Sequence, residues 1–186
     1  MPPLSALWLP IVLSAVIVFV ASSIVHMLLP YHRGDYKQLP DEDKMLAAIR
    51  AAGGIKRGLY VFPHTTHKEM NSPAMIEKYN QGPVGMLIAF PTGRPAMGKF
   101  LGLWFVYCLI ISFFVAYLSA HTVAQGVYYL AVFRVVGTAA FLSYGLGPLA
   151  NVIWKGYPWS FVIKEAVDGL IYALLTAGTF GWLWPK

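Results

Sequence analysis

The sequence predicts a mainly α-helical fold, a bundle of four transmembrane helices with a small α+β insert outside the membrane between the first two helices. The chain of 186 residues is 58% hydrophobic and only 12% charged, which is too apolar for a soluble domain of this length. Its apolar residues gather in four runs, each about the 20 residues that a hydrocarbon core roughly 30 Å thick requires of a helix. The runs cover residues 7–29, 100–120, 127–148 and 161–183.

The first run makes residues 1–30 a transmembrane anchor. It differs from a secretory signal because no basic residue precedes it and no small-x-small cleavage site follows it before Pro30. Its apolar stretch is also longer than the hydrophobic region of a signal peptide. We therefore expect this segment to stay in the membrane.

Residues 31–98 form the only stretch able to make a soluble unit, and their pattern predicts the order helix, strand, helix, strand. Asp41 is suited to cap a first short helix, and Ser72 with the proline after it opens a second. The apolar runs at 59–62 and 84–90 are each stopped by a Phe-Pro pair and predict strands. Because the core of such a unit is small, we expect it to depend on the membrane face or on a partner for stability.

Residues 99–186 hold the other three runs, joined by links too short to form domains. Small residues recur at every fourth position of the last run, which places them in one stripe on the helix. The stripe consists of Gly169, Ala173, Ala177 and Gly181. Small side chains let helix backbones approach closely in lipid, so this stripe predicts a packing face. This face packs either against other helices of the same chain or against a second copy of the chain.

The basic residues predict the orientation of the chain. Those near the predicted helix ends fall on one face of a four-span topology, with Lys186 as the exception, and they are Arg33, Lys37, Arg94, Lys99, Lys155 and Lys164. The positive-inside rule makes this face cytoplasmic, so residues 31–98 are cytoplasmic and both termini periplasmic. We therefore expect the basic residues behind the net charge of +6 to contact membrane lipid and not nucleic acid.

Three charged residues fall inside the predicted spans, namely Arg134, Glu165 and Asp168. Ionisable groups in a span are unfavourable in lipid, usually face the bundle interior and tend to pair. Counting from the predicted helix ends, we expect Arg134 and Asp168 to approach each other. Such an intramembrane polar pair either orients the helices or lines a path for an ion or a proton.

Histidines supply the candidate metal ligands. His64 and His67 are three residues apart and would share a face if they lay on a helix, where they could bind zinc or copper. His26 and His32, around the inner end of the first span, are further candidates. The alternative is that all four are solvated side chains of loops and interfaces.

No catalytic motif is present: the sequence has no glycine-rich phosphate loop, no GxSxG and no HExxH. We therefore expect no enzyme and no cofactor, and favour a non-enzymatic accessory or scaffold subunit that contacts other membrane subunits or itself. One alternative is a small oligomeric transporter or ion- or proton-conducting protein that uses Arg134 and Asp168. A second is a metal-binding membrane protein that uses His64 and His67.

Several short motifs are spread over most of the chain: PYHRGDY at 30–36, LPDE at 39–42, YVFP at 60–63, GPVG at 82–85, WKGYPW at 154–159 and DGL at 168–170. In these motifs the chain resembles a group of bacterial integral membrane proteins to which no activity is assigned. The resemblance implies a location in the bacterial inner membrane. It carries no functional residue over to this chain.

Overall fold

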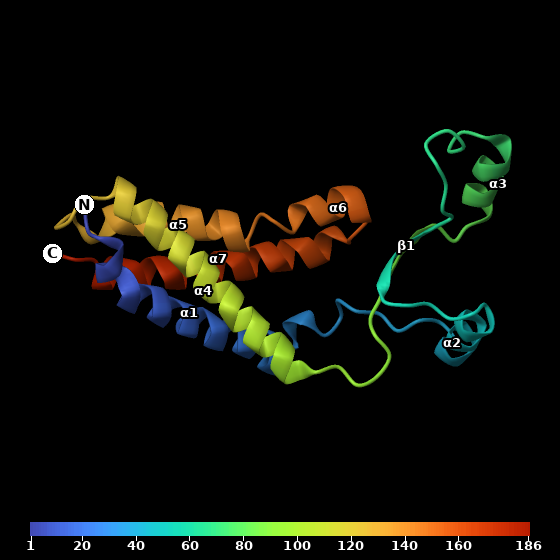
Figure 1. Cartoon of the computed structure of the whole chain (residues 1–186), viewed down its shortest axis with the longest axis horizontal. Coiled ribbons are helices and arrows are strands. Elements are labelled where there is room, and N and C mark those ends of the chain that lie inside the picture. The colour runs from blue at the N-terminus through green and yellow to red at the C-terminus, as the bar shows by residue number, and fades with distance from the viewer. The chain divides into compact units, whose positions relative to one another are not determined.

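The computed structural model describes all 186 residues, and the chain is mainly helical (Figure 1). It divides into two compact units. One joins Met1–Asp35 to Ala96–Lys186, and the other is Tyr36–Pro95. The second unit begins and ends within a few residues of the insert that the sequence predicts.

The prediction of four helical stretches long and apolar enough to cross a membrane is confirmed, by length and composition, and all four belong to the first unit. The first stretch, Leu4–Leu28, consists of a 3₁₀ turn, helix α1 (Trp8–Ser23) and a π-helical turn. The other three are α4 (Met97–Thr122), the pair α5 (Tyr129–Tyr144) and α6 (Leu149–Lys155), and α7 (Trp159–Leu183).

The third stretch is interrupted between α5 and α6: the sequence predicts one helix over residues 127–148, whereas α5 ends at Tyr144 and α6 begins only at Leu149. Two glycines and Pro148 occupy the break, and proline has no N–H to continue the helical hydrogen-bond pattern. Gly145 also lies directly against α7, because a Cβ on Gly169 would overlap its backbone. The close approach of these two glycines joins the end of α5 to the middle of α7.

Helix α7 is the centre of the packing, because it lies along both α5 and α1, and α1 also packs against α4. The stripe of small residues on α7 faces α5: Gly137 lies beside Ala177, and the ring of Tyr129 lies beside Gly181. These contacts run in opposite directions along the two helices, so α5 and α7 are antiparallel. A buried hydrogen bond of 3.0 Å from Ser14 to Ser112 joins α1 to α4.

The outward faces of these helices are also apolar. Large hydrophobic side chains are exposed on each of them, among them Val20, Phe114, Leu142 and Ile163. A water-soluble protein of this size rarely exposes so much contiguous apolar surface. The bundle surface therefore suits a hydrocarbon environment.

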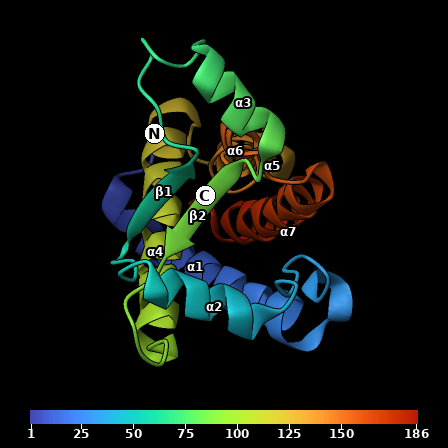
Figure 2. The same cartoon turned by 90° about the vertical axis from the view of Figure 1, so that its right-hand side faces the viewer.

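The unit of residues 36–95 has the predicted order of elements: α2 (Glu42–Ala51), β1 (Gly58–Phe62), α3 (Pro73–Gln81) and β2 (Gly85–Ala89). The two strands lie side by side and antiparallel in Figure 2, with Gly58 opposite Ala89. Of all its side chains only that of Met75 is buried, with 8% of the residue exposed. This unit has almost no core of its own.

The two helix starts in this unit differ. Ser72 caps α3 as predicted, because its hydroxyl oxygen accepts a hydrogen bond of 3.3 Å from the backbone N–H of Met75. Asp41 does not cap α2: its backbone is left-handed, with φ 46°, and its carboxylate pairs with Lys44 instead. A nearby lysine competes successfully for the carboxylate that the sequence assigns to the cap.

Candidate metal centre

The candidate site lies where the end of the first helical stretch meets the beginning of α7. The π-helical turn Ile24–Leu28 carries His26, and the short turn Pro30–His32 brings His32 back toward α7. Glu165 and Asp168 are three residues apart in the early turns of α7 and share one face of the helix. A π-helical turn of this kind is frequent at functional sites.

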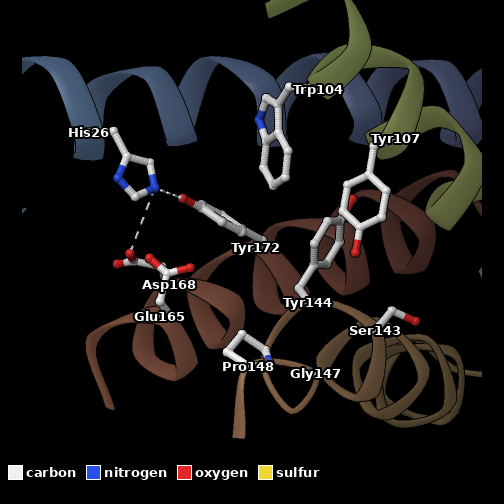
Figure 3. A pocket seen from close by; sticks show the side chains of 10 residues that line it. All are labelled: His26, Trp104, Tyr107, Ser143, Tyr144, Gly147, Pro148, Glu165, Asp168 and Tyr172. Carbon is white, nitrogen blue, oxygen red and sulfur yellow. Dashed lines mark hydrogen bonds and ion pairs between the residues drawn. The ribbon is translucent and has the colours of Figure 1, made fainter. Parts of the chain in front are cut away.

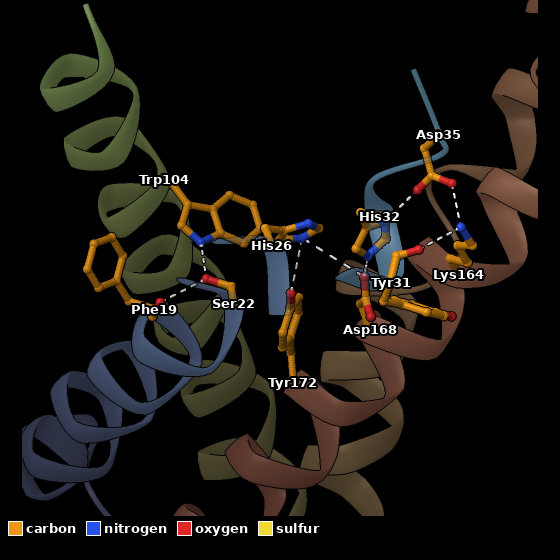
Figure 4. Close-up of polar contacts among 10 residues, drawn as sticks. All are labelled: Phe19, Ser22, His26, Tyr31, His32, Asp35, Trp104, Lys164, Asp168 and Tyr172. Carbon is orange, nitrogen blue, oxygen red and sulfur yellow. Dashed lines mark hydrogen bonds and ion pairs between the residues drawn. The ribbon is translucent and has the colours of Figure 1, made fainter. Parts of the chain in front are cut away.

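Two histidines and two carboxylates converge here. Figure 4 shows three of them, His26, His32 and Asp168. His32 Nε2 lies 2.8 Å from Asp168 Oδ2, and His26 Nε2 lies 3.9 Å from the same oxygen. With one oxygen of Glu165, the four possible ligand atoms all lie within 4.8 Å of one another. The Asp168 side chain is only 4% exposed, so this carboxylate is held away from solvent.

A second layer of contacts fixes the orientation of His32. Its other ring nitrogen, Nδ1, lies 2.6 Å from Asp35 Oδ2. Lys164 Nζ lies 2.5 Å from Asp35 Oδ1 and donates a hydrogen bond of 2.8 Å to the carbonyl oxygen of Tyr31. Histidines that bind metals usually donate their second ring N–H to a carboxylate in this way. Nε2 of His32 is thereby left to face the other three ligands.

The charges around His32 explain its titration. Burial alone would lower the pKa of His32, but hydrogen bonds to Asp35 and Asp168 outweigh it and the pKa is raised. The hydrogen bond from Lys164 is the main reason that the pKa of Asp35 is lowered. A protonated His32 therefore bridges two carboxylates, and a metal ion would take the place of the proton on Nε2.

One carboxylate oxygen in this group has no hydrogen-bond partner. Asp168 Oδ1 is buried and accepts no hydrogen bond. A buried carboxylate oxygen without a donor or a cation is unfavourable, by about 1–3 kcal/mol or more. This oxygen is the clearest sign that the site is built for something beyond the residues that surround it.

The structure therefore groups the predicted residues differently. His26 and His32 appear in the sequence analysis as metal candidates, and Glu165 and Asp168 as charges within a span, but not as one set. His64 and His67 are exposed in the unit of residues 36–95 and belong to no comparable group. Only the convergence of helix ends reveals the set of four.

Arg134 does not approach Asp168, contrary to the sequence-based expectation. It is exposed on α5, beside a groove of about 370 Å³ that Leu118 and Leu142 also line. Because Gly137 lies beside Ala177 and the helices are antiparallel, Arg134 is level with about residue 180 of α7. That level is about 18 Å along the helix from Asp168 at 1.5 Å per residue.

A cavity of about 290 Å³ adjoins the centre (Figure 3). Glu165, Asp168 and His26 line one side of it, and the hydroxyl of Tyr172 lies 3.4 Å from His26 Nε2. The remaining wall is mostly aromatic and comes from α4, α5, α7 and the break between α5 and α6. The candidate centre therefore has an adjoining space large enough for a small chemical group.

No protein-family model, curated protein or solved structure matches this chain.

Proposed function

We propose that this protein is a multi-pass membrane protein that binds a divalent transition metal ion through His26, His32, Glu165 and Asp168. The observation that supports this most directly is the convergence of two imidazoles and two carboxylates within 4.8 Å, with Asp35 behind one imidazole. Imidazole nitrogens and carboxylate oxygens together suit Zn²⁺, which takes about four ligands of this kind. Zn²⁺ is therefore the ion with which to test the site.

The membrane location rests on the four apolar helical stretches and on their apolar outer faces. Figure 1 places both chain termini at the end of the bundle opposite the turn that holds His32. Most basic flanking residues belong to the metal end, so the positive-inside rule assigns that end to the cytoplasm of a bacterial inner membrane. Both termini are then periplasmic.

The bundle interior favours a resident metal over a transported one. Between the centre and the far end of the bundle, the buried side chains are mostly apolar, and the polar ones are hydroxyls such as Ser14, Ser112 and Thr176, with no charged group among them. A permeating ion needs a chain of polar or charged groups to replace its water. Arg134, the other charge expected to serve such a path, lies on the outside of α5.

The test is zinc binding by protein purified in a neutral detergent and stripped with a chelator. We expect about one Zn²⁺ per chain by elemental mass spectrometry, and a rise in Tm on adding Zn²⁺. His32→Ala and Asp168→Asn should abolish both, and Asp35→Asn should weaken binding by about 10- to 100-fold. Asp43→Asn, an exposed acid of α2, is the matched control.

A parent protein that binds no zinc, or a His32→Ala variant that binds as well as the parent, would contradict the proposal. In that case the cluster is an ion-pair network that ties the turn at 30–35 to α7. Cu²⁺ and Mn²⁺, titrated in parallel, establish whether another divalent ion is preferred.

A second candidate function, an accessory or scaffold subunit, is favoured by the unit of residues 36–95. Its single buried side chain and its mostly exposed strand β1 leave much of its apolar surface without cover. A stoichiometric subunit that co-purifies in mild detergent, and that is lost when 36–95 is replaced by a short linker, would support this role. Purification of the intact chain alone, at native-like lipid content, would contradict it.

A further inference from the structure

We propose that the cavity beside the metal centre binds the primary ammonium group of an amphiphilic molecule that enters from the bilayer. This inference rests on the membrane location proposed above but not on the metal. It follows from the aromatic wall of the cavity, the sign of its charges and one unpartnered oxygen.

Four aromatic rings line the cavity and contact one another in a closed circuit (Figure 3). Their centroids are 5.3 Å apart for Trp104 and Tyr107, and 6.2 Å apart for Tyr107 and Tyr144. The circuit closes through Tyr172, whose centroid lies 5.7 Å from that of Tyr144 and 6.4 Å from that of Trp104. Three of these four contacts are edge-to-face, so the rings turn faces as well as edges toward their surroundings. Ring faces attract cations.

The charges that line the cavity also favour a cation. Two carboxylates, Glu165 and Asp168, face it, and neither lysine nor arginine does. His26 is the only lining residue that can carry positive charge. An anionic ligand would therefore meet two like charges, whereas an ammonium group meets two opposite charges beside an aromatic wall.

Asp168 Oδ1 distinguishes a primary ammonium from a quaternary one. This buried oxygen has no hydrogen-bond donor, and a primary ammonium carries three N–H groups that could supply one. A quaternary ammonium has none. Oδ2 of the same carboxylate faces His32, so the metal and the ammonium group would use different oxygens.

Size and access indicate an amphiphile. At about 290 Å³ the cavity lies at the lower limit for ligand pockets, so it accommodates a headgroup and leaves a longer tail outside. Its exposed lining residues are His26, Tyr107, Ser143 and Gly147, which mark the mouth on the outer surface of the bundle. In the proposed membrane location, that mouth opens near the cytoplasmic interface of the bilayer.

The experiment measures the binding of octylammonium to the full chain, chelator-stripped and in a neutral detergent, by isothermal titration calorimetry. We expect saturable binding at least tenfold tighter than that of octanoate, and tighter than that of octyltrimethylammonium. Zinc binding by the same stripped protein is titrated separately, and Asp43→Asn, an exposed acid outside the cavity, should bind octylammonium as the parent does. A failure of zinc binding and a failure of ammonium binding are thereby separate results.

Two variants test the aromatic wall of the cavity and its negative charge. Trp104→Leu should weaken octylammonium binding by about fivefold, whereas Trp159→Leu, 61% exposed and outside the cavity, should not. Because Trp104 also donates a hydrogen bond to Ser22, Glu165→Gln provides a milder second variant and should weaken binding as well. Equal binding of octanoate and octylammonium, or parent-like binding by both variants, would overturn the proposal. Tighter binding of octyltrimethylammonium would overturn the role of Asp168 Oδ1.

Discussion

The two units of this protein each carry a pair of histidines, and the contrast between the pairs is instructive. His64 and His67 have the closer spacing in sequence, yet they lie exposed in a unit with one buried side chain. His26 and His32 are six residues apart, yet two carboxylates of α7 converge on them. A well-packed bundle brings distant ligands together, whereas local spacing without a supporting core does not.

The largest effect should come from removing each histidine pair in turn and measuring zinc affinity. His26→Ala with His32→Ala should lower zinc affinity by more than 100-fold, because only carboxylates remain. His64→Ala with His67→Ala should leave the affinity unchanged. Elemental analysis after equilibrium dialysis measures both. If the second double variant loses zinc and the first retains it, the contrast between the units is wrong.

A smaller effect is expected at the glycine contact between α5 and α7. Gly169→Ala places a Cβ where the backbone of Gly145 lies, and such overpacking typically lowers the free energy of unfolding by about 1–3 kcal/mol. Gly102→Ala on α4 is the matched control, because no atom lies within 4 Å of its added Cβ. Equilibrium unfolding of both variants in detergent is the measurement. Equal stabilities would mean that the two helices do not pack this closely.

The core of the 36–95 unit can be tested through Met75. Met75→Ala removes its only buried side chain, so amides of that unit should exchange with deuterium faster than in the parent. Amides of α1, α4, α5 and α7 should exchange as before, because the two units have separate cores. Hydrogen exchange followed by mass spectrometry reads both regions in one experiment. Faster exchange in the bundle helices would show that the units share stability.

The smallest effect is the pH dependence of stability in metal-free protein. The pKa of Asp35 is lowered in the folded protein, so this group adds stability at pH values above 3.8, its ordinary pKa. That stability is lost as the pH falls through the lower pKa of the folded state. The pKa of His32 is raised in the folded protein, so this group adds stability at pH values below 6.5, its ordinary pKa. That stability is lost as the pH rises through the higher pKa of the folded state. Tm should therefore be highest between these limits. Asp35→Asn should flatten the profile at its acidic end, and an unchanged profile would exclude this carboxylate as a stabilising group.

Much of the fold could be predicted from the sequence because hydrophobicity over long windows decides it. The four apolar runs and the alternation of short helices and strands in the insert follow from local pattern. The break after Tyr144 was missed, although the two glycines and Pro148 signal it, because they fall near the expected end of a run. At Asp41 the sequence pattern predicts a helix cap, but in the structure the carboxylate pairs with the neighbouring Lys44.

The candidate site was predicted only in pieces. His26, His32, Glu165 and Asp168 were each singled out, but the turn at 30–32 that unites them depends on tertiary packing. The expected approach of Arg134 to Asp168 relied on depth counted from helix ends. The register between α5 and α7, which glycine contacts set, cannot be counted from either helix alone.

Asp35 has a mechanical consequence. It is the last residue of the first segment of the bundle unit, so the chain leaves for the 36–95 unit at the residue that also contacts His32 and Lys164. A force applied to the chain at residue 36 therefore acts on Asp35 and its contacts before it acts on helix α1. The imidazole of His32 and the point where the chain leaves the bundle are thus three residues apart and are linked through one carboxylate.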